Sequence, residues 1–305
     1  MKEKDGLLLR ELADGTYELA QVKDDEIGYA EVPKGVSRIA PMAFYACLEL
    51  TYVSLPEGVT EIGEQAFGQC RALREIFLPE SLVKIGNRAF RHCKRLERIS
   101  LPHGVKELGA YAFIGCDELA KAHLSNGLSH LSDGVFMNCS SLREVSLLSA
   151  LSEIGEQAFY GCASLAALAI PDGLLRVGKE AFYACEGLLS ISLPDTVREM
   201  GSEALAECES LACFSLPRGV RRIENGLLSG CTSLARLDLH DGVRSIGDAA
   251  LYGCSALTSL AVPAAVEEIG SLALAHCVSL SSLTLPARFR EAEIFRPHAC
   301  RVVYV

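Results

Sequence analysis

The cysteines of this 305-residue chain constrain its fold more than any other feature. Twelve of the thirteen follow one another at intervals of 23 residues: Cys47, Cys70, Cys93, Cys116, Cys139, Cys162, Cys185, Cys208, Cys231, Cys254, Cys277 and Cys300. The peptide IGEQAF also occurs twice, at Ile62–Phe67 and Ile154–Phe159, four such intervals apart. A constant period in the twenties predicts a solenoid, in which each repeat is one coil that buries its apolar face against its neighbours.

Other positions of the repeat also keep their residue types. The position three before each Cys is Phe from Phe44 to Phe182 and Leu from Leu205 to Leu274. The position three after is Leu from Cys47 to Cys277, positions six and eight after are mostly aliphatic, and the position seven before is mostly Gly. One unit therefore reads C-x2-L-x2-I-x-L-P-x-G-V-x2-I-G-x2-A-F-x2.

This pattern predicts the course of one coil. The I-x-L segment alternates apolar and polar residues, which indicates a strand with one buried face, and Pro ends it. V-x2-I indicates an extended return, while A-F-x2-C-x2-L places apolar residues on one face of a short helix. We therefore expect about twelve 23-residue coils of strand, turn, extended return and short helix, with a parallel sheet along one face.

The unit resembles the BspA-type leucine-rich repeat of bacterial and protist proteins, whose consensus is near L-P-x2-L-x2-I-G-x2-A-F-x2-C-x2-L-x2-I-x. The resemblance covers residues 32–303 and implies an α/β leucine-rich-repeat solenoid. Better-known leucine-rich repeats carry a buried ladder of Asn, which this chain lacks. By analogy, we expect the stacked Cys and the small residues at the corners to fill that space.

We expect a single structural domain with a cap at each end, because a solenoid needs its open faces covered. Residues 1–31 are expected to form an N-terminal hairpin cap, since Asp14-Gly15 is a strong turn signal between two apolar runs. Residues 32–287 are expected to form the solenoid. Residues 288–305 are expected to be a degenerate last coil and C-terminal cap, where four residues replace small or apolar ones: Arg288, Glu293, Arg296 and Pro297.

Charge and hydropathy limit the kinds of partner that we expect for this chain. The net charge is −10, and no basic stripe is apparent, so we expect no nucleic-acid binding. No apolar run approaches the roughly 18 residues of a membrane helix, which predicts no membrane insertion. No signal peptide is visible, so the chain is expected in the cytoplasm as it stands, or at the cell surface or outside the cell if it is a trimmed piece. We expect a monomer.

Disulfides and metals are not expected for the cysteine series. Neighbouring coils should lie about 4.8 Å apart, beyond the Cβ separation of about 3.5–4.5 Å that a disulfide needs. The sequence has no C-x2-C pair for zinc. Because a buried Cys behaves as a small hydrophobe, we predict a reduced packing ladder without metal or cofactor.

Catalytic motifs are not apparent either. GLLRVGKE (173–180) approaches a phosphate-binding loop, but Glu180 stands where Ser or Thr is needed, and two Gly positions of the repeat explain its glycines. We therefore expect no enzyme and no catalytic residues. The one cysteine outside the series, Cys213, lies on the outward side of a predicted strand, with Arg236 at the same position of the next coil. It is either a small residue on a smooth face or a reactive thiol, which a neighbouring guanidinium favours.

The outward positions of the strands, five and seven after each Cys, are the candidate binding surface. Aromatic residues and Arg dominate binding hot spots, so we predict a ligand-binding patch formed by Tyr52, Glu75, Phe77, Arg98, Lys121 and His123. The alternative is purely structural, because Glu75 and Arg98, like Lys121 and Glu144, are opposite charges on adjacent strands, which also stabilise a sheet.

Three functions follow. The favoured one is a non-enzymatic protein–protein interaction scaffold that presents an extended repeat surface to an unknown protein partner. The resemblance implies an alternative, a cell-surface adhesin or host-ligand-binding protein. A second alternative is a thiol-based role through Cys213.

Overall fold

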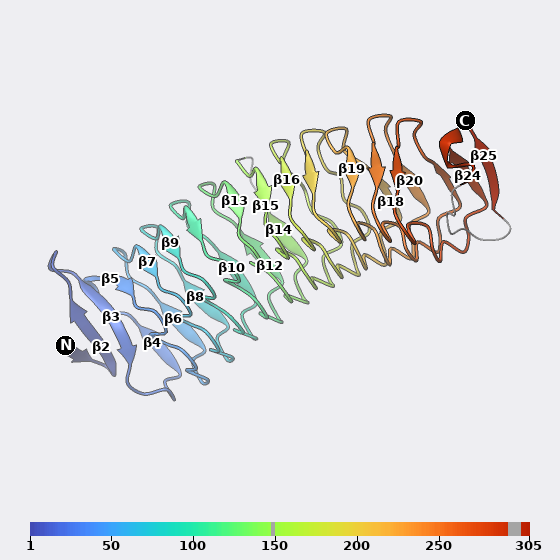
Figure 1. Ribbon diagram of the computed structural model, residues 1–305. Coiled ribbons are helices and arrows are strands. Elements are labelled where there is room, and N and C mark those ends of the chain that lie inside the picture. Colours follow the sequence, from blue (N-terminus) through green and yellow to red (C-terminus); the bar gives the residue numbers. More distant parts are fainter. Residues whose placement is uncertain (148–149, 292–299) are drawn as a thin grey trace. The chain divides into compact units, whose positions relative to one another are not determined.

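The computed structural model describes residues 1–147, 150–291 and 300–305. The chain forms two compact units, Met1–Leu151 and Ser152–Val305. In each unit the coils carry two rows of short parallel strands, one on each side of a buried core (Figure 1). The expected solenoid of parallel strands is therefore confirmed.

The first row of the N-terminal unit begins with an antiparallel sheet of β1 (Lys2–Lys4), β2 (Leu7–Glu11) and β3 (Tyr17–Val22). β3 then pairs in parallel with β5 (Val36–Ile39), and the row continues through β7 (Glu61–Ile62), β9 (Lys84–Ile85) and β11 (Glu107–Leu108); β13 (His130–Leu131) belongs to the same unit. The hairpin buries Leu7, Leu9, Leu19 and Val22. That residues 1–31 act as an N-terminal cap stays a prediction.

The second row of this unit contains the wider strands. β4 (Tyr29–Glu31), β6 (Tyr52–Ser54) and β8 (Glu75–Phe77) form one sheet, and β10 (Arg98–Ser100), β12 (Lys121–His123) and β14 (Glu144–Ser146) form another. In each strand the middle residue is buried, and the two flanking residues are exposed or half-buried. This alternation gives the row its outward-facing surface.

The C-terminal unit repeats the plan. One row consists of β15 (Glu153–Ile154), β16 (Arg176–Val177) and β17 (Glu199–Met200), then β19 (Arg222–Ile223), β21 (Ser245–Ile246) and β23 (Glu268–Ile269). The other pairs β18 (Cys213–Ser215) with β20 (Arg236–Asp238), and β22 (Ser259–Ala261) with β24 (Ser282–Leu285) and β25 (Arg301–Tyr304). A 3-10 turn, Ala287–Phe289, precedes residues 292–299, so the predictions for Glu293, Arg296 and Pro297 lie outside the described residues.

The predicted short helix is wrong, because the backbone N–H groups at this corner alternate between two partners. Ala43, Tyr45 and Cys47 donate to carbonyls three residues earlier, at 3.2, 3.0 and 3.1 Å. The residues between them donate to the next coil instead: Met42 to Glu64, Phe44 to Ala66 and Ala46 to Gly68, at 2.9, 2.7 and 2.8 Å. An α-helix needs every N–H for the carbonyl four residues earlier, so bonding between coils replaces it with consecutive turns.

Backbone angles repeat the same corner in every described coil. The positions five and one before each Cys have positive φ, as at Met42 (58°) and Ala46 (61°). Such left-handed angles are unfavourable for residues other than Gly, and most of these positions carry larger residues. The corner is therefore held by its hydrogen bonds and by the packing of the core beneath it.

Aromatic rings fill the core of the N-terminal unit. Phe90 lies between Phe67 and Phe113, with ring centroids 5.3 Å away on both sides and planes tilted by 2° and 5°. All three rings are fully buried. In the C-terminal unit Phe159 and Phe182 stack at 5.2 Å, and buried leucines occupy the position in the following coils. Each ring thus packs mainly against its own copy in the next coil.

The cysteine series is a hydrogen-bond ladder as well as a packing ladder. The Cys70 thiol donates to the Phe44 carbonyl at 3.0 Å, and the Cys93 thiol donates to the Phe67 carbonyl at 3.1 Å. The same bond recurs in the C-terminal unit, for example from Cys231 to Leu205. Burial raises the pKa of Cys47 and Cys277 to about 11 and that of Cys185 to about 12. These thiols are therefore neutral at ordinary pH.

No helix among the described residues has the length and apolar character that crossing a bilayer requires.

Candidate functional site

Four successive strands of the N-terminal unit carry the six residues predicted to bind a ligand. They occupy the outward positions of β6, β8, β10 and β12, and we call them the β6–β12 patch: Tyr52, Glu75, Phe77, Arg98, Lys121 and His123. Tyr52 is half-buried and the other five are exposed. The period-two alternation of the strands therefore places all six on one face.

Two aromatic rings form the apolar part of this patch. The rings of Tyr52 and Phe77, on neighbouring strands, have centroids 5.7 Å apart and planes tilted by 51°. The side chain of Phe77 is 52 % exposed, whereas the ring of Phe67, ten residues earlier, is fully buried in the core. An exposed ring that packs on a second ring is a preformed apolar contact for a partner.

The two charge pairs considered from the sequence behave differently. Lys121 and Glu144 form an ion pair at 2.8 Å across β12 and β14, and the hydrogen bond from Lys121 lowers the pKa of Glu144. For this pair the structural interpretation holds. Glu75 and Arg98 form no ion pair in the described part of the chain, where β8 and β10 belong to separate sheets. The Arg98 guanidinium is thus left for another partner.

A groove of about 340 Å³ lies over the interruption between β8 and β10. Its walls include Glu75, Phe77, Arg98 and His123, so four of the six patch residues converge on it. His123 also contacts Ser146 on the next strand, with Nδ1 3.1 Å from Oγ. The structure brings an aromatic face, a guanidinium, an imidazole and a carboxylate to one open site.

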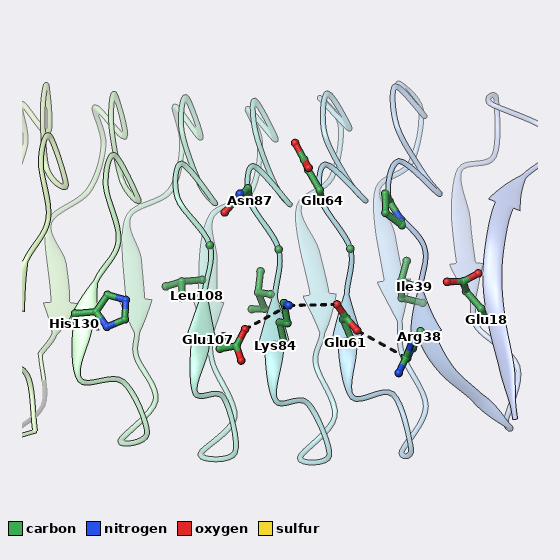
Figure 2. Close-up of a pocket in the computed structure, with 15 residues that line it drawn as sticks. Glu18, Arg38, Ile39, Glu61, Glu64, Lys84, Asn87, Glu107, Leu108 and His130 are labelled. Carbon is green, nitrogen blue, oxygen red and sulfur yellow. Dashed lines mark ion pairs between the residues drawn. The ribbon is translucent and has the colours of Figure 1, made fainter. Parts of the chain in front are cut away.

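The first row of strands carries a feature that sequence reasoning missed. From Cys47 to Cys116 the position nine before the Cys alternates in charge, and Figure 2 shows the resulting chain of ion pairs in the N-terminal unit. Arg38 lies 3.8 Å from Glu61, Lys84 lies 3.7 Å from Glu61, and Lys84 lies 3.4 Å from Glu107. The signal was present in the sequence as one column of the repeat.

These ion pairs line a second groove, of about 670 Å³, beside the glycine column at Gly63, Gly86 and Gly109. Both cations in this series of ion pairs, Arg38 and Lys84, are already held by a carboxylate of a neighbouring coil. Exposed pairs of this kind contribute little individually, and they align the coils rather than leave a charge for a ligand. The β6–β12 patch is therefore the better candidate in this unit.

Cys213 is exposed on β18 and lies opposite Arg236 on β20. The Arg236 guanidinium is engaged elsewhere, because its Nε donates to Asp238 Oδ1 at 3.0 Å. That hydrogen bond raises the pKa of Arg236 and lowers the pKa of Asp238. The cation thus contacts a carboxylate of its own strand, and a reactive role for Cys213 stays a prediction.

The described residues hold no cluster that could bind a metal ion. Nowhere in 1–147, 150–291 or 300–305 do three His, Cys, Asp or Glu side chains lie together in such an arrangement.

Comparison with known structures agrees with the coil geometry. A leucine-rich repeat protein from Bacteroides ovatus is 23 % identical, with a TM-score of 0.65 over 100 % of this chain and 99 % of the other. A leucine rich cell surface protein from Faecalibacterium prausnitzii is 25 % identical, with a TM-score of 0.61 over 92 % and 93 %. The pneumococcal vaccine antigen PcpA is 21 % identical, with a TM-score of 0.56 over 83 % and 67 %.

The family comparison covers most of the sequence. No curated protein matches the chain. The model of the BspA type leucine rich repeat region (6 copies) matches residues 23–143 and 175–295. The resemblance expected from the 23-residue unit is thereby confirmed, and the chain belongs to the BspA-type leucine-rich repeat family.

Proposed function

We propose that this chain is a non-enzymatic interaction scaffold that binds a protein partner through the β6–β12 patch. The observation that carries the proposal is the exposed Phe77 ring, packed on Tyr52 and beside an Arg98 without an ion pair, at one groove of about 340 Å³. Aromatic residues and Arg supply most of the energy at protein interfaces. BspA-type repeat proteins as a group bind proteins or act at surfaces, which agrees with this assignment.

The groove suggests what the partner offers. An apolar side chain would pack on Phe77, and a carboxylate would accept two parallel hydrogen bonds from the Arg98 guanidinium, the strongest common geometry for such a pair. Lys121 would contribute less, because Glu144 already holds it. Tyr52, Phe77 and Arg98 are therefore the residues on which affinity depends.

An affinity capture from extracts of the producing organism tests the proposal. The immobilised wild-type chain is compared with the double variant Tyr52→Ala/Phe77→Ala and with the control Leu189→Ala, which removes an exposed apolar side chain of the C-terminal unit. We expect one partner to be retained by the wild type and the control and lost from the double variant. Equal retention by all three would place the interface elsewhere.

A location at the cell surface is the second candidate. It is favoured by the similarity to the Faecalibacterium prausnitzii protein, which is described as a cell surface protein and aligns over 92 % of this chain. Proteolysis of intact producing cells, followed by detection of the chain, tests it. Cleavage from outside supports an adhesin or a host-ligand-binding protein, whereas full protection until lysis contradicts that assignment.

The thiol-based alternative depends on Cys213. We expect iodoacetamide to modify this exposed thiol while buried ladder thiols such as Cys93 and Cys208 stay protected. Mass spectrometry of the native protein after limited alkylation measures this. Loss of partner capture in Cys213→Ser would favour the thiol role, and unchanged capture would leave the scaffold as the function.

A further inference from the structure

Three arginines occupy one column of the C-terminal unit on consecutive coils. Arg198, Arg221 and Arg244 each lie ten residues before a Cys of the series, and all three are exposed. The backbone confirms that neighbouring members are adjacent, because the Arg244 N–H donates to the Arg221 carbonyl at 2.8 Å. We call these residues the Arg column. The expectation that the chain has no basic stripe does not hold here.

The Arg column differs from the other cations around it. Arg176 contacts Glu153 and Glu199 at 3.3 and 3.6 Å, and Arg222 contacts Glu224 at 3.0 Å. In the described part of the unit, by contrast, no carboxylate forms an ion pair with any member of the Arg column. Arg244 Nη1 donates only to the Asp241 carbonyl, at 3.4 Å. Three guanidinium groups are therefore left without a counter-charge.

This arrangement opposes the stability of the fold. Strands of neighbouring coils lie about 4.8 Å apart, and like charges directly opposite each other are destabilising. The unit has carboxylates to spare, since residues 152–305 contain 12 Lys and Arg against 18 Asp and Glu, a net charge of −6. An uncompensated basic column in an acidic unit points to an anion that comes from outside.

The ends of the column limit the length of that anion. Leu175 precedes Arg198 at the same position and is 49 % exposed, and the Arg198 N–H donates to its carbonyl at 2.8 Å. Glu267 follows Arg244, and its N–H donates to the Arg244 carbonyl at 2.7 Å. A long polyanion would run onto Glu267 and be repelled. A short run of acidic residues next to an apolar residue would complement the three arginines and Leu175 together.

A groove beside the Arg column gives such a segment room. Its volume is about 610 Å³, and Arg198 and Arg221 line it together with Met200 and Gly201. Glu156, Glu199 and Glu224 line it as well, but Glu199 is paired with Arg176 and Glu224 with Arg222. Arg244 continues the column on the next coil, so along the Arg column three carboxylates can each accept paired hydrogen bonds from one guanidinium. We propose that the Arg column is a second binding site, independent of the β6–β12 patch, which takes a short acidic segment of a protein with three closely spaced carboxylates on the arginines and an apolar side chain on Leu175.

Fluorescence anisotropy with a labelled EEEEL peptide tests the site, and QQQQL serves as the uncharged control. We expect EEEEL to bind at low salt, more weakly as salt rises, and at least about tenfold more weakly to the triple variant Arg198→Gln/Arg221→Gln/Arg244→Gln. The matched control Arg71→Gln/Arg74→Gln/Arg95→Gln removes three exposed arginines of the N-terminal unit and should bind like the wild type. No binding to the wild type, or equal binding to the triple variant, would overturn the proposal.

Further measurements test whether the arginines are structural and whether the site prefers a protein segment to other anions. Because the triple variant relieves repulsion, its melting temperature at low salt should equal or exceed that of the wild type, and a clear decrease would mean that the arginines are structural. Tighter binding of a hexauronate or a short oligothymidylate than of EEEEL would overturn the assignment to a protein segment. Phe77→Ala should bind EEEEL normally, which separates this site from the proposed function.

Discussion

Single residues determine how closely the coils stack, because most columns of the repeat contact their own copies. Phe, Cys and Gly each occupy one environment many times, which is why their columns could be predicted from spacing alone. The hydrogen bond from thiols such as Cys70 and Cys93 to a carbonyl of the preceding coil could not, since the spacing identifies a buried Cys without showing which way its thiol points. The alternating charges at Arg38, Glu61 and Lys84 were visible in the sequence, but only when the residues nine before successive Cys are compared with one another.

Phe90→Ala tests the aromatic core. The ring is fully buried between Phe67 and Phe113, so its loss should lower the free energy of unfolding by about 3–5 kcal/mol. Phe77→Ala is the matched control, because this ring is 52 % exposed, and its loss should cost under about 1 kcal/mol. Urea unfolding followed by circular dichroism measures both. Similar losses for the two variants would mean that the Phe column is not the core.

Gly86→Ala tests the close approach of the coils. A Cβ at Gly86 would lie 2.7 Å from the Glu64 backbone nitrogen and 2.8 Å from the Gly63 carbonyl carbon. Backbone atoms cannot yield as a flexible side chain does, so we expect a loss of about 1–3 kcal/mol. Gly28→Ala, where the nearest atom is 4.0 Å away, should be close to neutral. A neutral Gly86→Ala would show that the coils can separate without cost.

The strands of the coil were predicted correctly from the sequence, whereas the corner was predicted wrongly. Parallel strands were expected from alternation, and β6, β8, β10 and β12 show it. The corner was predicted as a helix because its apolar spacing fits one helical face. That spacing cannot reveal that Met42, Phe44 and Ala46 donate to the next coil, which is a property of stacked coils and not of one repeat.

The thiol ladder should make the protein sensitive to alkali. Burial raises the pKa of the ladder thiols, to about 11 for Cys47 and Cys277 and about 12 for Cys185, above the roughly 8.5 of an unfolded cysteine. The stabilisation is complete below about pH 8.5 and is lost as the pH rises through the folded values. Each such thiol lowers stability by about 1.4 kcal/mol per pH unit in that range, so the effects add steeply.

Urea midpoints at pH 7.5, 9 and 10 measure this dependence. We expect a small change up to about pH 8.5 and a steep fall above it. Cys93→Ala removes one buried thiol and should reduce the slope above pH 9, although the variant is less stable at pH 7.5. Equal midpoints at pH 7.5 and 10 would contradict neutral buried thiols in the fold.

At the scale of the whole molecule, the repeat predicts a surface much better than it predicts a ligand. The chain belongs to the BspA-type family, and each unit presents rows of outward side chains around its own buried core. Six predicted residues fell on one face because alternation in a strand is strict. Which of them is available could not be predicted, because Lys121 is held by Glu144 while Arg98 lies at an interruption of the sheet.

The central claim, that the β6–β12 patch is the protein-binding surface, is tested most directly by a photo-cross-linker. p-Benzoylphenylalanine replaces Phe77 in one chain and Leu189, an exposed residue of the C-terminal unit, in another, and each is irradiated in producing cells. The account predicts one discrete adduct from position 77 and none from position 189. An adduct from position 189 alone would contradict it.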